Sequence, residues 1–170
     1  ARHAPVVLTC GAPSVILFPG IIPQPGTTTG LPTAGREGGV ARRSILIIDD
    51  TATWRRLLRR VLSGTDYAVH TAATCADGLK SAELHEPDCI VLDFHLTDGD
   101  AVSVCSALKT NESLKKIPVI ICSSDPGVEI TAYAECKAAY FILKGTRLVI
   151  DLPRVIEGVL SPGFSPQTGE

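Results

Sequence analysis

Long hydrophobic runs are missing from this sequence, which limits where the chain can reside. No apolar stretch reaches the roughly 18–20 residues that are needed to span a bilayer. The best candidate, residues 15–22, is interrupted by Pro19 and Gly20 and followed by Pro23, and no convincing basic leader precedes it. We therefore expect no membrane span and no secretory signal, and we predict a cytoplasmic protein.

An excess of one charge is missing too. The chain has 18 acidic and 16 basic residues, a net charge of −2 at pH 7 and a pI of about 6.1. This balance gives no strong field to attract nucleic acid or an anionic membrane, so we predict neither partner for this chain. Methionine is absent altogether. Ala1 is therefore not an initiator residue, and we expect a processed or excised chain.

The usual cysteine signatures of metal sites are also missing. None of the six cysteines forms a CxxC pair, and the four histidines show no ligand spacing with them. Cys89 and Cys122 lie inside apolar runs of strand length, and Cys105 lies on an apolar helical pattern. We interpret the cysteines as small buried residues in a reducing compartment, with zinc binding or disulfides as the less favoured alternatives.

The composition divides the chain into a core and two tails. Residues 1–43 contain 6 proline and 7 glycine residues and no aspartate, which predicts a flexible N-terminal tail. Residues 161–170 are rich in proline and glycine and predict a C-terminal tail or the start of a linker. Residues 44–160, by contrast, alternate between short apolar runs and amphipathic stretches.

This alternation predicts five strand–helix units. The predicted strands are 45–49, 67–72, 88–93, 119–123 and 139–143. The predicted helices are 54–63, 76–85, 100–110, 126–137 and 150–160. Strands that are apolar throughout are typical of a parallel sheet covered on both faces. We therefore predict a doubly wound α/β fold with right-handed crossovers, whose ligand binds at the carboxyl ends of the strands.

Five polar residues follow the ends of these apolar runs, namely Asp49, Asp50, Asp93, Ser123 and Lys144. In a parallel sheet all five meet at one edge. Two carboxylates about 4 Å apart there repel each other by roughly 4 kcal/mol at an effective dielectric constant of about 20. A divalent cation and the lysine would offset this repulsion, and Mg²⁺ prefers such oxygen ligands. The pattern therefore predicts a metal-dependent phosphorylation site with an aspartate as nucleophile. Either Asp49 or Asp50 could alternatively cap the following helix.

Four segments of the chain carry a resemblance to a known family. They are Ile47–Asp50 (IIDD), 91–100 (VLDFHLTDGD), 118–124 (PVIICSS) and 140–144 (YFILK). Each is weak alone, but in this order and spacing they make residues 44–160 resemble a response-regulator receiver domain of two-component signalling. The resemblance implies a flavodoxin-like, five-stranded parallel sheet in the order 2-1-3-4-5 with helices on both faces.

The resemblance also implies roles at the acidic site. Asp93 would accept a phosphoryl group from a histidine kinase or a histidine phosphotransfer protein. Asp50 would bind Mg²⁺ directly, Asp49 would help to position the ion, and Asp93 and the backbone carbonyl of His95 would complete the metal site. The chain would be a signalling phosphoacceptor rather than an enzyme, and its output partner is not named by the sequence.

Three further residues are implied in the response to phosphorylation. Ser123 and Lys144 would hold the phosphoryl oxygens. Phe141 would be the aromatic switch residue that changes rotamer on activation, with Tyr140 as the fallback and plain packing as the alternative role.

The chain departs from the family pattern at three positions. Thr97 and Gly145 stand where the family usually has proline, and Ala101 stands where it usually has glycine. Since the lysine–proline bond is typically cis in the family, glycine at 145 predicts a looser or differently placed loop. None of the three changes touches the phosphorylation chemistry.

Several alternatives stay open. An aspartyl phosphatase or phosphotransferase of the haloacid-dehalogenase type wants an acid two residues after the nucleophile, where this chain has His95. A calcium-binding loop at 98–100 lacks the later ligands. A degenerate receiver could act only as an interaction module. Trp54 either completes the core face of the first helix or lies near the acidic site. The arginine face of that helix is either solvated or docks the phosphodonor.

Overall fold

The computed structural model describes residues 42–164, so most of the two predicted tails lies outside the described residues. The strands of the main sheet are β1 (Ser44–Ile48), β2 (Ala68–Ala72), β3 (Cys89–Asp93), β6 (Val119–Ser123) and β7 (Tyr140–Leu143). The helices are α1 (Ala52–Ser63), α2 (Cys75–His85), α3 (Ala101–Thr110), α4 (Glu129–Ala134) and α5 (Leu148–Val159). Three short elements complete the set: β4 (His95–Leu96), β5 (Gly99–Asp100) and the 3₁₀ turn η1 (Pro126–Val128).

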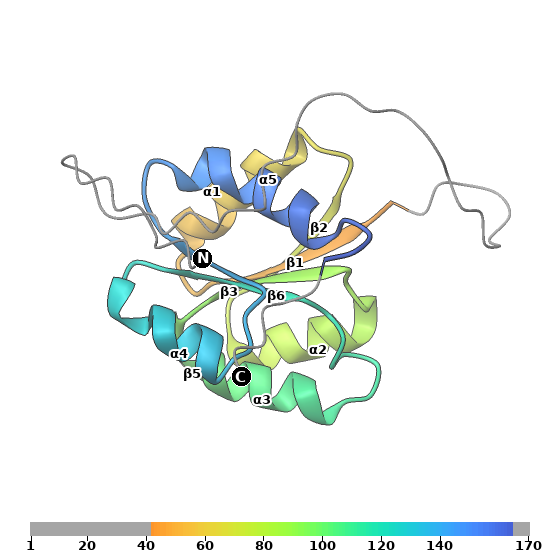
Figure 1. The fold of residues 1–170 in the computed structure, drawn as a ribbon, viewed down its shortest axis with the longest axis vertical. Coiled ribbons are helices and arrows are strands. Elements are labelled where there is room, and N and C mark those ends of the chain that lie inside the picture. The colour runs from red at the N-terminus through yellow and green to blue at the C-terminus, as the bar shows by residue number, and fades with distance from the viewer. Residues whose placement is uncertain (1–41, 165–170) are drawn as a thin grey trace, which may run out of the picture. The chain divides into compact units, whose positions relative to one another are not determined.

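The main sheet is parallel throughout and has the order β2-β1-β3-β6-β7. This confirms the predicted doubly wound, five-stranded sheet, since the order is 2-1-3-4-5 when the short β4 and β5 are set aside. Figure 1 shows α1 and α5 on one face and α2, α3 and α4 on the other. The carboxyl ends of all five strands therefore lie along the same edge.

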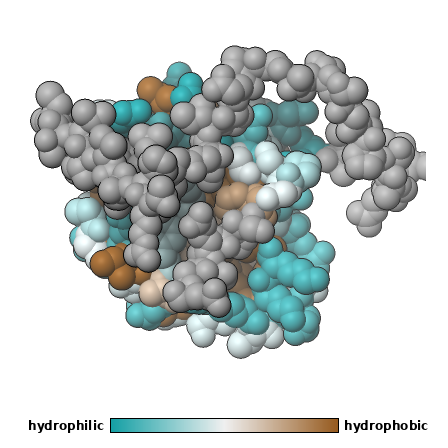
Figure 2. Space-filling model, viewed as in Figure 1, coloured by the Kyte–Doolittle hydropathy of each residue, from teal (hydrophilic) through white to brown (hydrophobic). Residues whose placement is uncertain are grey.

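Strand residues alternate between two apolar clusters, one on each face. Leu46 and Ile48 of β1 pack with α2, α3 and α4, whereas Ile45 and Ile47 pack with α1 and α5. All four are at most 1% exposed, and burying such a side chain contributes about 1.5–3 kcal/mol. Coverage of both faces explains why β1, β3 and β6 are largely apolar without alternation. The visible described surface, in contrast, is mostly hydrophilic with separate hydrophobic patches (Figure 2).

Two local features differ from the expectation. The helix predicted over 126–137 is shorter, because the Asp125 carboxylate accepts the Gly127 N–H and begins a 3₁₀ turn. At its other end Lys137 takes the left-handed conformation (φ 54°), which stops the helix. The antiparallel pair β4–β5 was not predicted, since its strands have only two residues each.

The five cysteines within the described part are buried and free, as expected, and Cys10 lies outside it. Among residues 42–164 no helix has the length and apolar character to cross a bilayer.

Candidate functional site

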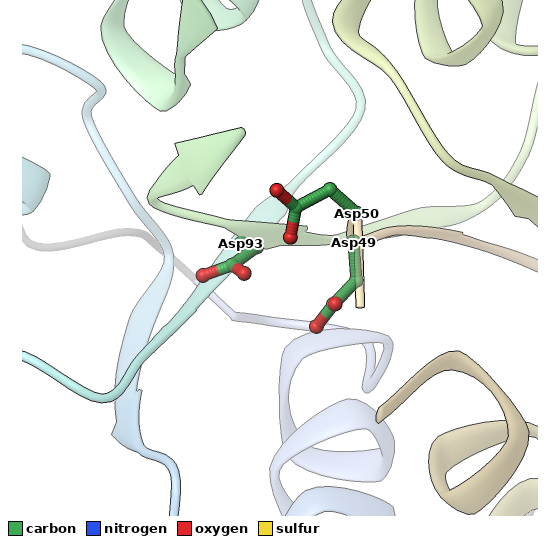
Figure 3. A group of neighbouring side chains, drawn as sticks. All are labelled: Asp49, Asp50 and Asp93. Atoms are coloured by element: carbon green, nitrogen blue, oxygen red, sulfur yellow. The ribbon is translucent and has the colours of Figure 1, made fainter. Parts of the chain in front are cut away.

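Three aspartates gather at the carboxyl edge of the sheet. Asp49 and Asp50 follow β1, and Asp93 ends β3, the strand beside it. One carboxylate oxygen from each lies within 4.8 Å of the other two. Figure 3 shows the three carboxylates around one small region beyond the strand ends. Asp49 and Asp93 are buried, at 1% and 7% exposed, whereas Asp50 is half-buried.

Lys144 follows β7 and reaches across the sheet edge to this cluster. Its Nζ donates a hydrogen bond to Asp93 Oδ2 at 2.6 Å and lies 2.7 Å from Asp49 Oδ2. The side chain is only 3% exposed, a burial that charged groups tolerate when they are paired. Burial by itself lowers the pKa of Lys144, but Asp49 and Asp93 more than offset this, so its pKa is raised and it stays an ammonium.

The cluster is short of positive charge. Burial raises the pKa of Asp93, Lys144 opposes the change, and the charges of Asp49 and Asp50 add to it. The net result is a raised pKa: burial is its largest cause, and the single ammonium of Lys144 does not outweigh it.

The residues fit a hard divalent cation. Asp49 Oδ1 accepts the Thr51 N–H at 2.8 Å, but the buried Oδ2 receives no hydrogen bond of good geometry, although Lys144 Nζ is close. The Lys144 ammonium offsets the charge of this oxygen, and a carboxylate oxygen without an aligned donor keeps lone pairs for a metal ion. Together with Asp50 and Asp93 it offers the set of carboxylate oxygens that Mg²⁺ prefers.

Ser123 lies beside the lysine because β6 and β7 pair. It is fully buried at the end of β6, and its carbonyl accepts the Lys144 N–H at 2.7 Å. Its Oγ accepts the Asp125 N–H at 3.1 Å, which leaves the hydroxyl proton free to be donated. The structure thus brings Asp49, Asp50, Asp93, Ser123 and Lys144 to one edge, as the sequence predicts.

Phe141 lies in the interior, three residues before the lysine. Its side chain is 8% exposed and belongs to the cluster under α4, and its N–H donates to the Tyr133 hydroxyl at 3.1 Å. The position is that of the predicted switch residue, and its movement stays a prediction.

The loop after Asp93 is held by helix caps. Asp98 accepts the N–H groups of Cys75 and Ala76 at the start of α2, and Asp100 accepts the N–H of Ser103 in α3. These carboxylates serve the helix termini, which weakens the calcium-loop alternative. In the same loop His95, two residues after Asp93, has an exposed imidazole whose Nε2 is 3.8 Å from Asp125 Oδ2.

Two residues of α1 lie near the site: Trp54, for which the sequence leaves both the core and the site open, and Arg55, whose contact the sequence does not predict. The Trp54 ring centroid is 5.5 Å from Lys144 Nζ, and the ring also packs against the core beneath α1. Arg55 Nη1 donates to the Asp49 carbonyl at 2.6 Å. Arg55 is therefore tied to the loop after β1, whereas the sequence predicts an arginine face that is either solvated or docks the phosphodonor. Helical periodicity separates core from solvent, but it carries no signal for a contact back to the preceding loop.

A parallel sheet of this order, with clustered acids and a buried lysine at its carboxyl edge, defines the receiver class of flavodoxin-like proteins. Residues 45–149 match the profile of the response regulator receiver domain. The chain therefore belongs to this family, the receivers of two-component signalling.

Curated relatives include two transcriptional regulators. The KDP operon transcriptional regulatory protein KdpE of Escherichia coli is 36% identical over 81 residues, which are 48% of this chain and 35% of KdpE. The transcriptional regulatory protein PrrA of Mycobacterium tuberculosis is 34% identical over 93 residues, 55% of this chain and 39% of PrrA. The match thus spans little more than a third of each relative.

Solved structures share the fold. A putative response regulator from Chloroflexus aurantiacus has a TM-score of 0.62 at 23% identity, and the match covers 69% of this chain and 97% of that one. The receiver domain of a sensor histidine kinase from Pseudomonas aeruginosa has a TM-score of 0.62 at 20% identity, with 71% and 98% covered. Its structure has a magnesium ion coordinated in the active-site cleft.

Proposed function

We propose that this chain takes a phosphoryl group from a phosphohistidine onto Asp93, with Mg²⁺ as cofactor. The donor would be a histidine kinase or a histidine phosphotransfer protein. The observation that carries the proposal is the buried Asp93 carboxylate, 2.6 Å from Lys144 Nζ and grouped with two other carboxylates. Family membership and the magnesium ion in the Pseudomonas receiver support the same reading.

The chemistry requires little from the protein beyond position and charge. The Asp93 oxygen not bound by Lys144 attacks phosphorus, the phosphorus–nitrogen bond of the donor breaks, and the imidazole leaves in line. The product is a mixed anhydride on Asp93. Asp49, Asp50, Asp93 and the His95 carbonyl would hold Mg²⁺, which neutralises charge on the phosphoryl oxygens when bound.

The response would begin at the same sheet edge. The new phosphoryl group adds charge and three acceptor oxygens, which the Lys144 ammonium and the Ser123 hydroxyl would engage. Movement of Ser123 toward the site would leave space that Phe141, now buried beside α4, could use in a new rotamer. Such repacking changes the exterior of α4 and β7, where an output partner or a further domain would respond.

The phosphoacceptor assignment is tested by substitution of Asp93. Wild-type chain treated with acetyl phosphate and Mg²⁺ should gain the mass of one phosphoryl group and lose it in hydroxylamine. Asp93→Asn should gain none, because the amide is a poor nucleophile. Asp66→Asn is the matched control, since that side chain is fully exposed and precedes β2, whose amino end lies at the sheet edge opposite the cluster. Full acyl-phosphate labelling of Asp93→Asn would contradict the proposal.

The phosphatase alternative makes the opposite prediction. It needs an acid two residues beyond Asp93 to protonate the leaving group, and the structure has the exposed imidazole of His95 there. We expect no sustained turnover of p-nitrophenyl phosphate, and rapid turnover would favour that alternative.

A further inference from the structure

A cavity of about 320 Å³ lies at the end of the sheet opposite the aspartates. It is lined where β6 and β7 begin, at Val119 and Ala139, whereas Ser123 and Lys144 lie where these strands end. The end of α3, the 111–118 connection, the turn after α4 and the end of α5 complete its wall. Its volume falls at the low end of the roughly 300–1,000 Å³ that is typical of small-molecule sites.

The rim of this cavity is positively charged. Among the described residues its lining includes Lys109, Lys115, Lys116 and Lys137 and no aspartate or glutamate, in a chain whose net charge is −2. A concave surface lined by one sign of charge concentrates its field and attracts the opposite charge. The positive potential is therefore a local feature of this cavity and not of the molecule.

The four lysines differ in their present contacts. Lys109 Nζ donates to the Glu135 carbonyl at 2.6 Å, which ties the end of α3 to the end of α4. Lys115 pairs at 2.6 Å with Glu112, an exposed i,i+3 contact of the kind that contributes little stability. Lys116 and Lys137 are exposed and form no ion pair with another residue of the 42–164 range, so no acid within this range competes with a ligand for them.

Lys137 is held at the rim by an unusual backbone. Its φ of 54° lies in the left-handed region, where glycine sits without strain and a lysine costs about 1–2 kcal/mol. Glycine would adopt this backbone conformation with less strain. The turn therefore does not explain why a lysine side chain stands at this position.

The interior of the cavity is apolar. Leu108, Leu114, Val119, Val159 and Phe164 line it together with the buried thiols of Cys105 and Cys136. A ligand that fills it must present hydrophobic surface inward and negative charge outward. Inorganic phosphate has no apolar part, and a neutral lipid has no charge for the rim.

We propose that this cavity binds a small organic anion, with an apolar body against the leucine, valine and phenylalanine side chains and a carboxylate, sulfonate or phosphate head between Lys116 and Lys137. The site is separate from the aspartates and needs neither Mg²⁺ nor phosphorylation.

The test is a fluorescence titration of the whole chain with 8-anilinonaphthalene-1-sulfonate, without Mg²⁺ or phosphodonor. Saturable one-to-one binding is expected, with amide NMR shifts concentrated in residues 108–118 and 136–139. Octanoate should displace the probe, whereas octanol and inorganic phosphate at equal concentration should not. Non-saturable binding, shifts centred elsewhere, or equal displacement by octanol would overturn the proposal.

Two variants separate binding from folding. Lys137→Gly should weaken the probe at least about threefold while its melting temperature stays the same or rises, because the backbone strain is relieved. Lys116→Gln should weaken the probe similarly, and Lys80→Gln on the exposed face of α2 is the charge-matched control. If Lys137→Gly and Lys116→Gln bound the probe within twofold of the wild type, as the Lys80→Gln control should, the proposed role of the rim lysines would be overturned. Because anion binding does not involve Asp93, a failed titration would leave the proposed phosphoacceptor function standing. Failure of Asp93 phosphorylation would likewise leave the anion site standing.

Discussion

At the scale of single residues, the acidic site is a problem of charge balance. Asp49 and Asp93 are buried against one lysine, and Asp50 adds a third negative charge at the rim. The strand-end positions of these residues and of Ser123 can be predicted from the sequence, because each follows an apolar run directly. The sequence does not show which carboxylate oxygens Lys144 contacts, since those contacts depend on the side-chain geometry of residues from three strands.

Arg55 is the residue whose role was not predictable. Its guanidinium holds the Asp49 carbonyl at 2.6 Å, and the Arg55 N–H closes the first turn of α1 on the Thr51 carbonyl at 3.1 Å. The turn that presents both Asp49 and Asp50 is therefore fastened to the helix that follows it. We infer that Arg55 is a positioning residue for the metal-binding acids.

The Arg55 prediction concerns metal affinity. Arg55→Met should weaken Mg²⁺ binding by roughly 3- to 10-fold, since a hydrogen bond from a charged donor is worth about 1.5–3 kcal/mol and this residue is only partly buried. Trp54 fluorescence provides the readout because its ring lies 5.5 Å from Lys144 Nζ. Arg59→Met on the same helix is the control, and Arg55→Lys should recover part of the affinity. Equal Mg²⁺ affinity in Arg55→Met and Arg59→Met would refute the role.

At the scale of elements, hydrophobic runs make the five strands predictable, whereas contacts between elements set the exceptions. The short α4 results from the Asp125 turn at one end and the left-handed Lys137 at the other. Asp98, in the turn between β4 and β5, accepts the N–H of Cys75, which lies 23 residues back at the start of α2. Neither effect is visible in the periodicity of the segment that it changes.

Two helical glycines with opposite surroundings test the packing of α2. A Cβ on Gly78 would lie 2.6 Å from Ile48 Cδ1, and Ile48 is buried in the core, whereas a Cβ on Gly158 in α5 would meet nothing within 4 Å. Gly158→Ala should therefore raise the free energy of unfolding by about 0.5–1 kcal/mol. Gly78→Ala should lower it by about 1–3 kcal/mol, because α2 must move away from β1. Urea denaturation measures both, and stabilisation by Gly78→Ala would show that the helix is not packed as described.

Asp98 gives the link between α2 and the β4–β5 loop a pH dependence. Hydrogen bonds from the Cys75 and Ala76 N–H groups lower the pKa of Asp98 below its ordinary value, although burial opposes this. A group whose pKa is lower in the folded state stabilises the fold above its unfolded pKa of about 3.9, and the contribution is lost as the pH falls through the lower folded value. Asp98→Ala should therefore reduce stability most at neutral pH. The gap from wild type should shrink steadily below about pH 4, as urea titrations at several pH values would show; a gap that is constant with pH would refute the cap.

At the scale of the whole molecule, the sheet separates two sites of opposite charge. The carboxyl edge concentrates the carboxylates of Asp49, Asp50 and Asp93, and the amino edge of β6 and β7 carries the lysine-lined cavity. The first site is predictable because parallel strands bring every strand end to one edge. The second is not, since its lysines come from a helix end, a connection and a turn that only the tertiary structure brings together.

We expect the acid cluster to make the stability of the chain depend on divalent cations. A ligand that binds only the folded state adds RT ln(1 + [L]/Kd), about 2.7 kcal/mol at 100 times Kd, so Mg²⁺ should raise the melting temperature by several degrees. Asp50→Ala should lose most of this rise. Without Mg²⁺, however, it should be at least as stable as the wild type, because one of three like charges has been removed. Differential scanning calorimetry with Mg²⁺, and with NaCl at equal ionic strength, separates binding from screening. If Mg²⁺ raised the melting temperature of wild type and Asp50→Ala equally, Asp50 would not be a metal ligand. The bound cation would then not be what offsets the repulsion between Asp50 and its neighbours.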